Sequence, residues 1–137
     1  MSGSGVLTFD VPLPPVELSP NYKTGYRPAL MGARAGYRDR VRDEAIIAAR
    51  LADWEMPQRV RVSLVFGTKA DKRSRLADRG YRPRDTPNAV SAWKQGFDGL
   101  VLAGIVPDDN HEHLELGNVT VRPDLGPGVT VIVVALE

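Results

Sequence analysis

The chain has 137 residues, in which 18 lysine and arginine side chains are balanced by 17 aspartate and glutamate side chains to leave a net charge of +1. This length favours one domain with one core, and the balance argues against a uniformly basic chromatin-type protein. The absence of cysteine excludes disulfides, iron–sulfur clusters and thiolate zinc sites. An enzyme with so few histidines would work mainly with carboxylates, lysine or arginine.

The first half of the chain predicts a strand, a loop, a helix and a second strand. Residues 1–5 form a small polar start that we expect to be flexible. Apolar and polar residues alternate over 6–11, as in a strand with one buried face. After a loop rich in glycine and proline, an apolar stripe with helical spacing predicts a helix over about 35–54. Alternation resumes over 60–66 and predicts another strand.

The second half predicts one helix and two strands. Thr86 is a favourable N-cap and Pro87 a favourable first helical residue, so we expect a helix over about 86–103. A strand is expected over 116–121. The β-branched run over 129–135 is typical of a strand that is buried on both faces. The order β-α-β-α-β-β, with two main helices and about four strands, predicts a single α+β domain.

A basic loop is expected over 67–86. From Lys69 to Arg84 the chain carries seven positive and two negative charges, a local net charge of +5, so the remainder carries −4. One interpretation is a solvated surface loop, and the other is an arm that contacts nucleic-acid phosphates. The candidate DNA-binding residues are Lys72, Arg73, Arg75, Arg79, Arg82 and Arg84, with Tyr81 among them as an aromatic side chain for base stacking.

Acidic residues flank the predicted second helix. Asp85 precedes it, Asp98 lies within it, and Asp108 and Asp109 follow it. If the chain doubles back after the helix, Asp85 and Asp109 become neighbours and form a set of oxygen ligands suited to Mg²⁺ or Mn²⁺. The alternative is ordinary turn chemistry, in which such residues only satisfy the backbone.

Other polar groups allow two interpretations each. His111 and His113 are either metal ligands or solvated side chains of a polar turn. Lys94 and Asp98 stand four residues apart and either form a helical ion pair or take part in chemistry. Trp93 and Phe97 fit the core stripe, whereas the aromatic residues of the loops, Tyr22, Tyr26 and Tyr81, are better placed for base stacking.

Several motifs occur in an order that resembles the RusA family of Holliday junction resolvases, and the similarity covers nearly the whole chain. The family pattern reads Asp-x-Asp-Asn, then a helix with Lys-x-x-x-Asp-x-Leu, then Asp-Asp. The matching stretches here are Ser19-Pro20-Asn21, Gly36-Tyr37-Arg38-Asp39, Arg84-Asp85-Thr86-Pro87-Asn88, Lys94-Gln95-Gly96-Phe97-Asp98-Gly99-Leu100 and Asp108-Asp109.

The resemblance implies a mixed sheet in a single domain spanning 1–137 and a Mg²⁺-dependent endodeoxyribonuclease (Mn²⁺ being possible) that resolves four-way DNA junctions in recombination and repair. It further implies a homodimer in the cytoplasm of a bacterium or of a phage-infected host cell. No membrane partner is expected, because no run in the sequence approaches the roughly 18 apolar residues that a spanning helix needs. By position, Asp85, Lys94 and Asp109 are the catalytic residues, and Asp85, Asp108 and Asp109 the metal ligands.

One position departs from the pattern, because Pro87 stands where the family has its second carboxylate. Proline cannot bind a metal ion. Either Asp98, Asp108 or Glu112 replaces the missing ligand, or the protein is a catalytically degenerate relative that binds DNA or a protein partner without cleavage.

Overall fold

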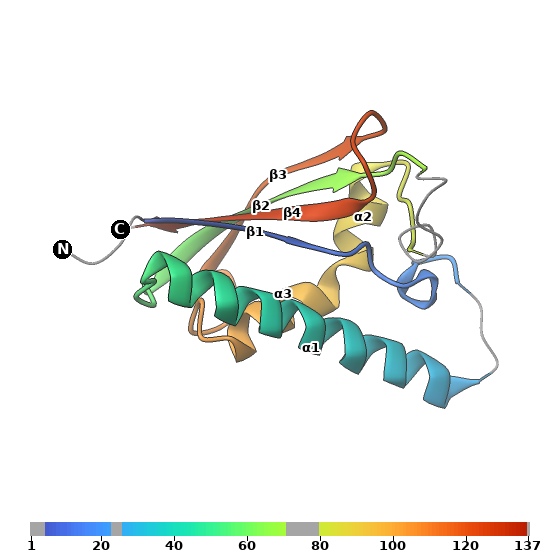
Figure 1. Ribbon diagram of the computed structural model, residues 1–137. Helices are drawn as coiled ribbons and strands as arrows, with labels where there is room; N and C mark the ends of the chain where they lie inside the picture. The colour runs from blue at the N-terminus through green and yellow to red at the C-terminus, as the bar shows by residue number, and fades with distance from the viewer. Residues whose placement is uncertain (1–4, 23–25, 71–79, 137) are drawn as a thin grey trace.

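The computed structural model describes residues 5–22, 26–70 and 80–136 (Figure 1). Its elements are β1 (Val6–Val11), the 3₁₀ helix η1 (Val16–Leu18), α1 (Arg27–Ala52), β2 (Arg59–Gly67), α2 (Thr86–Ala92), α3 (Lys94–Leu102), β3 (Leu114–Arg122) and β4 (Gly128–Leu136). The α+β class and the predicted order are confirmed, except that the second predicted helix is divided into α2 and α3.

The four strands form one mixed sheet in the order β1-β4-β2-β3. Strand β4 runs antiparallel to β1 and β2, whereas β2 and β3 are parallel, with Val60 beside Leu114 and Gly67 beside Arg122. Helices α2 and α3 make the crossover between β2 and β3. Strands β1, β2 and β3 therefore begin at one edge of the sheet, here called the amino edge, and end at the other, the carboxyl edge.

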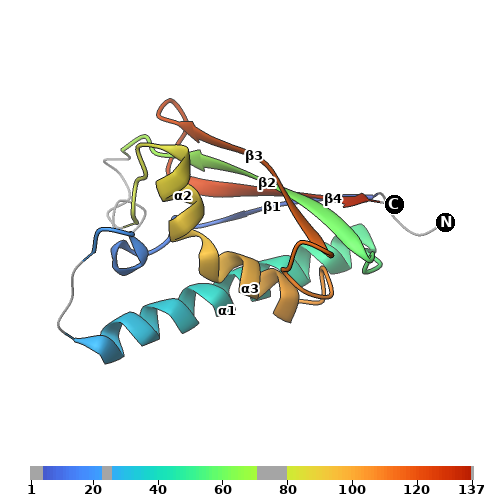
Figure 2. The same cartoon turned by 180° about the vertical axis from the view of Figure 1, so that it is seen from behind.

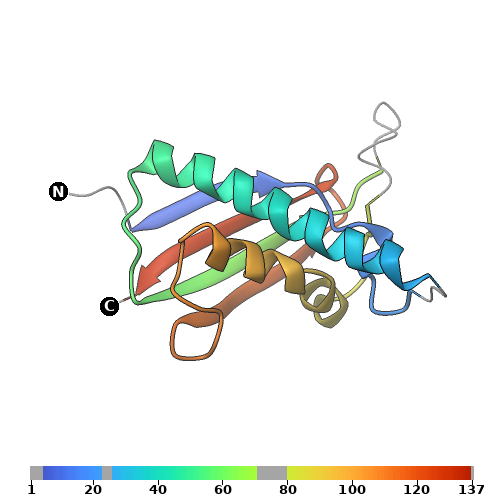
Figure 3. The ribbon, with the colours of Figure 1, turned by 90° about the horizontal axis from the view of Figure 1, so that it is seen from below.

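Helices α1 and α3 cover the same face of the sheet (Figure 3). The predicted stripe of α1 is confirmed, because Tyr37, Val41 and Ala45 are buried against this face. They meet inward-facing side chains of the strands, all buried: Leu7, Phe9, Val11, Val60, Val62, Leu64, Phe66, Val129, Val131 and Val133.

Strand β4 differs from its prediction, because only one of its faces is buried. Val129, Val131 and Val133 face the helices, and the residues between them are half-buried. The prediction of a strand buried on both faces was wrong because the described helices cover only one side of the sheet. On the open side the polar groups pair with one another, as where Thr130 Oγ1 donates to Asp10 Oδ1 at 2.8 Å.

Helix α1 begins at Arg27, eight residues before the predicted start. Pro28 lies in its first turn, where a missing backbone N–H costs nothing, so the proline that suggested a loop is part of the helix. The helix ends at Ala52 because Asp53 adopts a left-handed conformation with φ 53°. No helix in the described ranges is long and apolar enough to cross a membrane.

The predicted second helix is interrupted at Trp93, which has φ −95° and ψ 10°. The fully buried indole fills the space beside Gly96, where an added Cβ would lie 2.4 Å from the ring. Phe97 packs edge-on against the same ring, at a centroid distance of 4.9 Å. Packing of this large side chain into the core therefore interrupts the helix.

Candidate functional site

Asp85 is the N-cap of α2. Its two carboxylate oxygens accept hydrogen bonds from Asn88, one from the backbone N–H at 2.9 Å and one from the side-chain Nδ2 at 3.0 Å. The predicted cap was Thr86, so the helix starts as expected but the aspartate rather than the threonine caps it. This role accounts for Asp85 and Asn88 without any catalysis.

The chain before Asp85 is held at the carboxyl edge of the sheet. Gly80 forms an isolated antiparallel bridge with Pro15, and the Tyr81 N–H donates to the Pro14 carbonyl at 2.7 Å. Because Pro14 and Pro15 follow the end of β1, α2 also begins near this edge (Figure 2).

The basic loop is described only in part. Lys72, Arg73, Arg75 and Arg79 lie outside the described residues. Arg84 is exposed and Arg82 is half-buried, and both precede α2 on the carboxyl side of the sheet. Their role in DNA binding stays a prediction.

A second group of acidic side chains gathers at the end of α3. A cavity of about 280 Å³ is lined by Asp98 of α3, Asp108 and Asp109 of the following turn, and Arg38 of α1, together with two apolar residues of α3. We call it the acidic pocket. Within the turn, Asp108 Oδ1 accepts the Asp109 N–H at 2.7 Å, and Asp108 Oδ2 accepts Asn110 Nδ2 at 3.2 Å.

The acidic pocket raises the pKa of Asp109 above its ordinary value. Partial desolvation is the largest cause, followed by the hydrogen bond with Asp108 and by the negative charges of Asp98 and Asp108. Carboxylates that repel one another in this way are stabilised by a nearby cation. The pocket is therefore a place in the described structure where a positively charged ligand would be stabilised.

The turn that carries Asp108 and Asp109 is fixed to the amino edge. The Val60 N–H donates to the His113 carbonyl at 2.8 Å, and the His113 Nδ1 lies 2.7 Å from the Gln58 carbonyl. The His113 ring thus has a structural partner, while His111 is exposed.

The structure does not bring Asp85 and Asp109 together within one chain. Asp85 lies at the start of α2, and Asp109 lies beyond the end of α3, at opposite ends of the crossover (Figures 1 and 2). Strand β2, which this crossover spans, has nine residues, or about 30 Å at about 3.3 Å each. Among the described residues, no group of three or more His, Asp or Glu side chains is arranged to hold a metal ion.

Lys94 is the first residue of α3 and lines a third feature, here called the cationic pocket. This cavity of about 270 Å³ lies between η1, the start of α1 and the α2–α3 break, and its lining includes Glu17, Tyr22, Arg34, Lys94 and Gln95. It neighbours the acidic pocket, because Arg34 and Arg38 are one turn apart on α1, as are Lys94 and Asp98 on α3.

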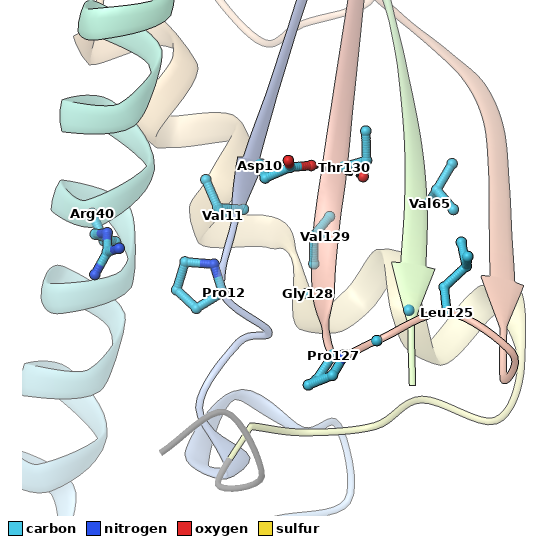
Figure 4. A pocket seen from close by; sticks show the side chains of 12 residues that line it. Asp10, Val11, Pro12, Arg40, Val65, Leu125, Pro127, Gly128, Val129 and Thr130 are labelled. Carbon is cyan, nitrogen blue, oxygen red and sulfur yellow. Dashed lines mark hydrogen bonds between the residues drawn. The ribbon is translucent and has the colours of Figure 1, made fainter. Parts of the chain in front are cut away.

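A further cavity, of about 420 Å³, lies elsewhere, at the carboxyl edge between β1, β4 and the turn before β4 (Figure 4). Its two charged lining residues already have partners. Asp10 accepts the hydroxyl of Thr130, and Arg40 pairs with Glu44 at 3.4 Å. This cavity offers little that would select a ligand.

Two basic residues of the site, Arg34 and Arg38, were not predicted as functional. Arg34 precedes the predicted helix start at about residue 35, and Arg38 entered the sequence analysis as part of the matched stretch Gly36-Tyr37-Arg38-Asp39. The signal that would have found them is Pro28 read as a first-turn proline. That reading extends the helix backward and puts both arginines on one face.

Comparison with protein-family models finds no match for this chain, and comparison with curated proteins finds no match either.

Proposed function

We propose that the protein is a Mg²⁺-dependent endodeoxyribonuclease that cleaves branched DNA, four-way junctions above all, in recombination or repair. The proposal rests on the ordered resemblance to RusA resolvases. The observation that carries it furthest is the acidic pocket, where desolvation, the hydrogen bond with Asp108 and the charges of Asp98 and Asp108 raise the pKa of Asp109. The electrostatic repulsion among these carboxylates has a functional explanation if they bind a divalent cation, which would relieve it.

The donor chemistry of the pocket suits Mg²⁺, which prefers carboxylate oxygens and is commonly held by one or two carboxylates, water and substrate phosphate. Asp109 and Asp108 would hold it, with Asp98 beside them. When bound, Mg²⁺ would activate water and neutralise charge on the phosphate. Lys94 would stabilise the negative charge of the same phosphodiester from the adjoining turn of α3. Hydrolysis adds one water across the ester bond and leaves a phosphate end and a hydroxyl end.

We further propose that the working unit is a homodimer, in which Asp85 of one protomer approaches the acidic pocket of the other. A single chain holds Asp85 and Asp109 at opposite ends of the α2–α3 crossover. A two-fold axis repeats any contact between two chains in both directions. One such contact would therefore complete two identical sites, one for each of two opposed DNA strands.

A second candidate function is a relative that binds branched DNA without cutting it. The observation that favours it is the start of α2, where Pro87 provides no ligand and both oxygens of Asp85 are engaged by Asn88. In this case Pro87→Asp would create or increase cleavage, because it restores the carboxylate of the family pattern.

The test is the cleavage of a labelled four-way junction with Mg²⁺ by the wild type, Asp109→Asn and Asp43→Asn. Asp43 is exposed on α1, so its variant removes the same charge away from the pocket. The proposal predicts cleavage by the wild type and Asp43→Asn and none by Asp109→Asn. Wild-type protein that binds the junction but does not cut it with Mg²⁺ or Mn²⁺ would support the second candidate, and cleavage retained by Asp109→Asn would contradict the proposed site.

A further inference from the structure

The cationic pocket contains the combination of groups that a nucleotide requires. Arg34 and Lys94 supply positive charge, Tyr22 supplies an aromatic ring, and Gln95 supplies an amide that both donates and accepts hydrogen bonds. The ring of Tyr22 remains available to solvent, since the residue is 43% exposed.

The two cations of this pocket are not neutralised by ion pairs in the described structure. No salt bridge among the described residues involves Arg34 or Lys94. Those of α1 join Arg38, Arg40 and Arg42 to neighbouring acidic side chains. Glu17, the acidic residue among those that line the pocket, is not within ion-pair distance of either. Both cations are therefore free to contact a phosphate.

The cationic pocket continues the acidic pocket along the seam between α1 and α3. Arg34 precedes Arg38, and Lys94 precedes Asp98, by four residues each, which corresponds to about 6 Å along a helix. The two helices approach closely here, because a Cβ on Gly99 would lie 2.6 Å from the Arg38 carbonyl oxygen. A DNA strand with one phosphate over the acidic pocket would therefore reach the cationic pocket with its neighbouring nucleotide.

The size of the cavity limits what it accepts. Its volume of about 270 Å³ lies just below the range of about 300 to 1,000 Å³ that is usual for small-molecule sites. This space is too small for stacked base pairs. A base that enters it must therefore be unpaired.

From these observations we propose that the cationic pocket binds an unpaired nucleotide of the substrate strand, next to the phosphate that lies over the acidic pocket. Arg34 contacts its phosphate, its base stacks on Tyr22, and Lys94 lies between this phosphate and the one over the acidic pocket. The inference rests on the proposed function for its location on the strand, while nucleotide binding itself does not depend on cleavage. It gives the protein a means of preferring branched DNA in which a nucleotide at the branch is unpaired over continuous duplex.

The experiment measures binding of a fluorescent single-stranded oligodeoxynucleotide and of its duplex in EDTA, so that no cleavage occurs. Tyr22→Leu should weaken single-strand binding by about five- to one-hundred-fold, because a base–aromatic stack is lost, whereas Tyr22→Phe should bind as the wild type does. Arg34→Gln should reduce the slope of log affinity against log salt by about 0.7, the value for one phosphate contact on a single strand. Arg50→Gln, at the other end of α1, serves as the charge-matched control and should leave the slope unchanged.

Single-strand binding that is unchanged in both Tyr22→Leu and Arg34→Gln would overturn the inference. An equal loss with Arg34→Gln and Arg50→Gln would also overturn it, because it would indicate unspecific attraction to charge. A protein that never cleaves junctions but shows the predicted losses would refute the nuclease and keep the nucleotide pocket. A protein whose cleavage requires Asp109 but whose single-strand binding is unaffected by substitution of Tyr22 and Arg34 would support the nuclease and refute the nucleotide pocket.

Discussion

Trp93 and Tyr37 are joined by a buried hydrogen bond, in which the indole Nε1–H of Trp93 donates to the hydroxyl oxygen of Tyr37 at 2.9 Å. The Tyr37 hydroxyl donates in turn to the Pro12 carbonyl at 2.7 Å. Burial raises the pKa of Tyr37 far above its ordinary value, so the hydroxyl keeps its proton. This chain of bonds ties the end of β1 and the middle of α1 to the residue that immediately precedes Lys94.

Tyr37→Phe should destabilise the protein. Removal of the hydroxyl leaves the buried Trp93 N–H without its partner, which costs about 1 to 3 kcal/mol, and also removes the partner of the Pro12 carbonyl, which lies on an exposed residue. Urea unfolding followed by tryptophan fluorescence measures the loss. Tyr22→Phe removes the same hydroxyl from a residue that is 43% exposed and should change stability by no more than about 0.5 kcal/mol. Equal effects of the two variants would show that the buried bonds are unimportant.

The contact between α1 and α3 at Gly99 should not tolerate a side chain. A Cβ at this position would meet the Arg38 carbonyl oxygen at 2.6 Å and the Val41 Cβ at 3.0 Å, so Gly99→Ala should cost about 1 to 3 kcal/mol through overpacking. Gly36→Ala is the matched control in α1, since nothing lies within 4 Å of its added Cβ. The control should gain about 0.5 to 1 kcal/mol from helix propensity. A Gly99→Ala protein as stable as Gly36→Ala would contradict this packing.

Two substitutions of Asp85 separate its capping role from metal binding. Asparagine caps helices about as well as aspartate, whereas alanine loses the cap at about 0.5 to 2 kcal/mol. Thermal unfolding should therefore find Asp85→Asn close to the wild type and Asp85→Ala less stable. If Asp85 also serves as a ligand in the dimer, both variants should lose junction cleavage. If the Asp85→Asn protein keeps full cleavage, then Asp85 only caps α2 and is not a metal ligand.

The pH dependence of stability should differ in sign between Asp109 and Asp124. The pKa of Asp109 is raised in the folded chain, so its ionisation disfavours folding, and this penalty appears as the pH rises through the raised pKa. Relative to the wild type, Asp109→Asn should gain stability between about pH 4 and pH 7.

The Arg122 side chain lowers the pKa of Asp124 through a hydrogen bond. Ionised Asp124 therefore favours folding above its unfolded pKa of about 3.9, and this contribution disappears as the pH falls through the lowered folded pKa. Asp124→Asn should lose stability at neutral pH, and the loss should shrink in acid. Urea unfolding of both variants across this pH range, in EDTA, measures the two slopes, and slopes of the same sign would contradict the electrostatics described for Asp109.

The sequence predicted the sheet better than the helices, for a physical reason. Alternation along β1 and β2 is a local pattern that reports which face is buried, and the structure confirms it. The β-branched run of β4 hides its alternation, because valine and isoleucine tolerate half-exposed positions as well as buried ones. The sequence of this strand therefore did not report that helices cover one face alone.

The break at Trp93 depends on contacts that are distant along the chain, whereas the early start of α1 has a local signal in the first-turn proline Pro28. Trp93 leaves the helical path where its buried ring packs beside Gly96, and Tyr37, 56 residues away, accepts its N–H. The acidic pocket needs the packing of α1 on α3. The order of the acidic residues was visible in the sequence, but their division between the two edges of the sheet follows from the parallel pairing of β2 with β3.

The most direct test of the two-chain site is a subunit-mixing experiment on a labelled four-way junction with Mg²⁺. Asp85→Asn and Asp109→Asn proteins are assayed separately, then unfolded together in equal amounts, refolded and assayed again. If the two residues meet across the dimer, each variant alone is inactive. The mixture then recovers about one quarter of the wild-type sites, because half of the dimers are mixed and each of these restores one of its two sites. A mixture as inactive as its separate components, although mixed dimers have formed, would contradict the shared site.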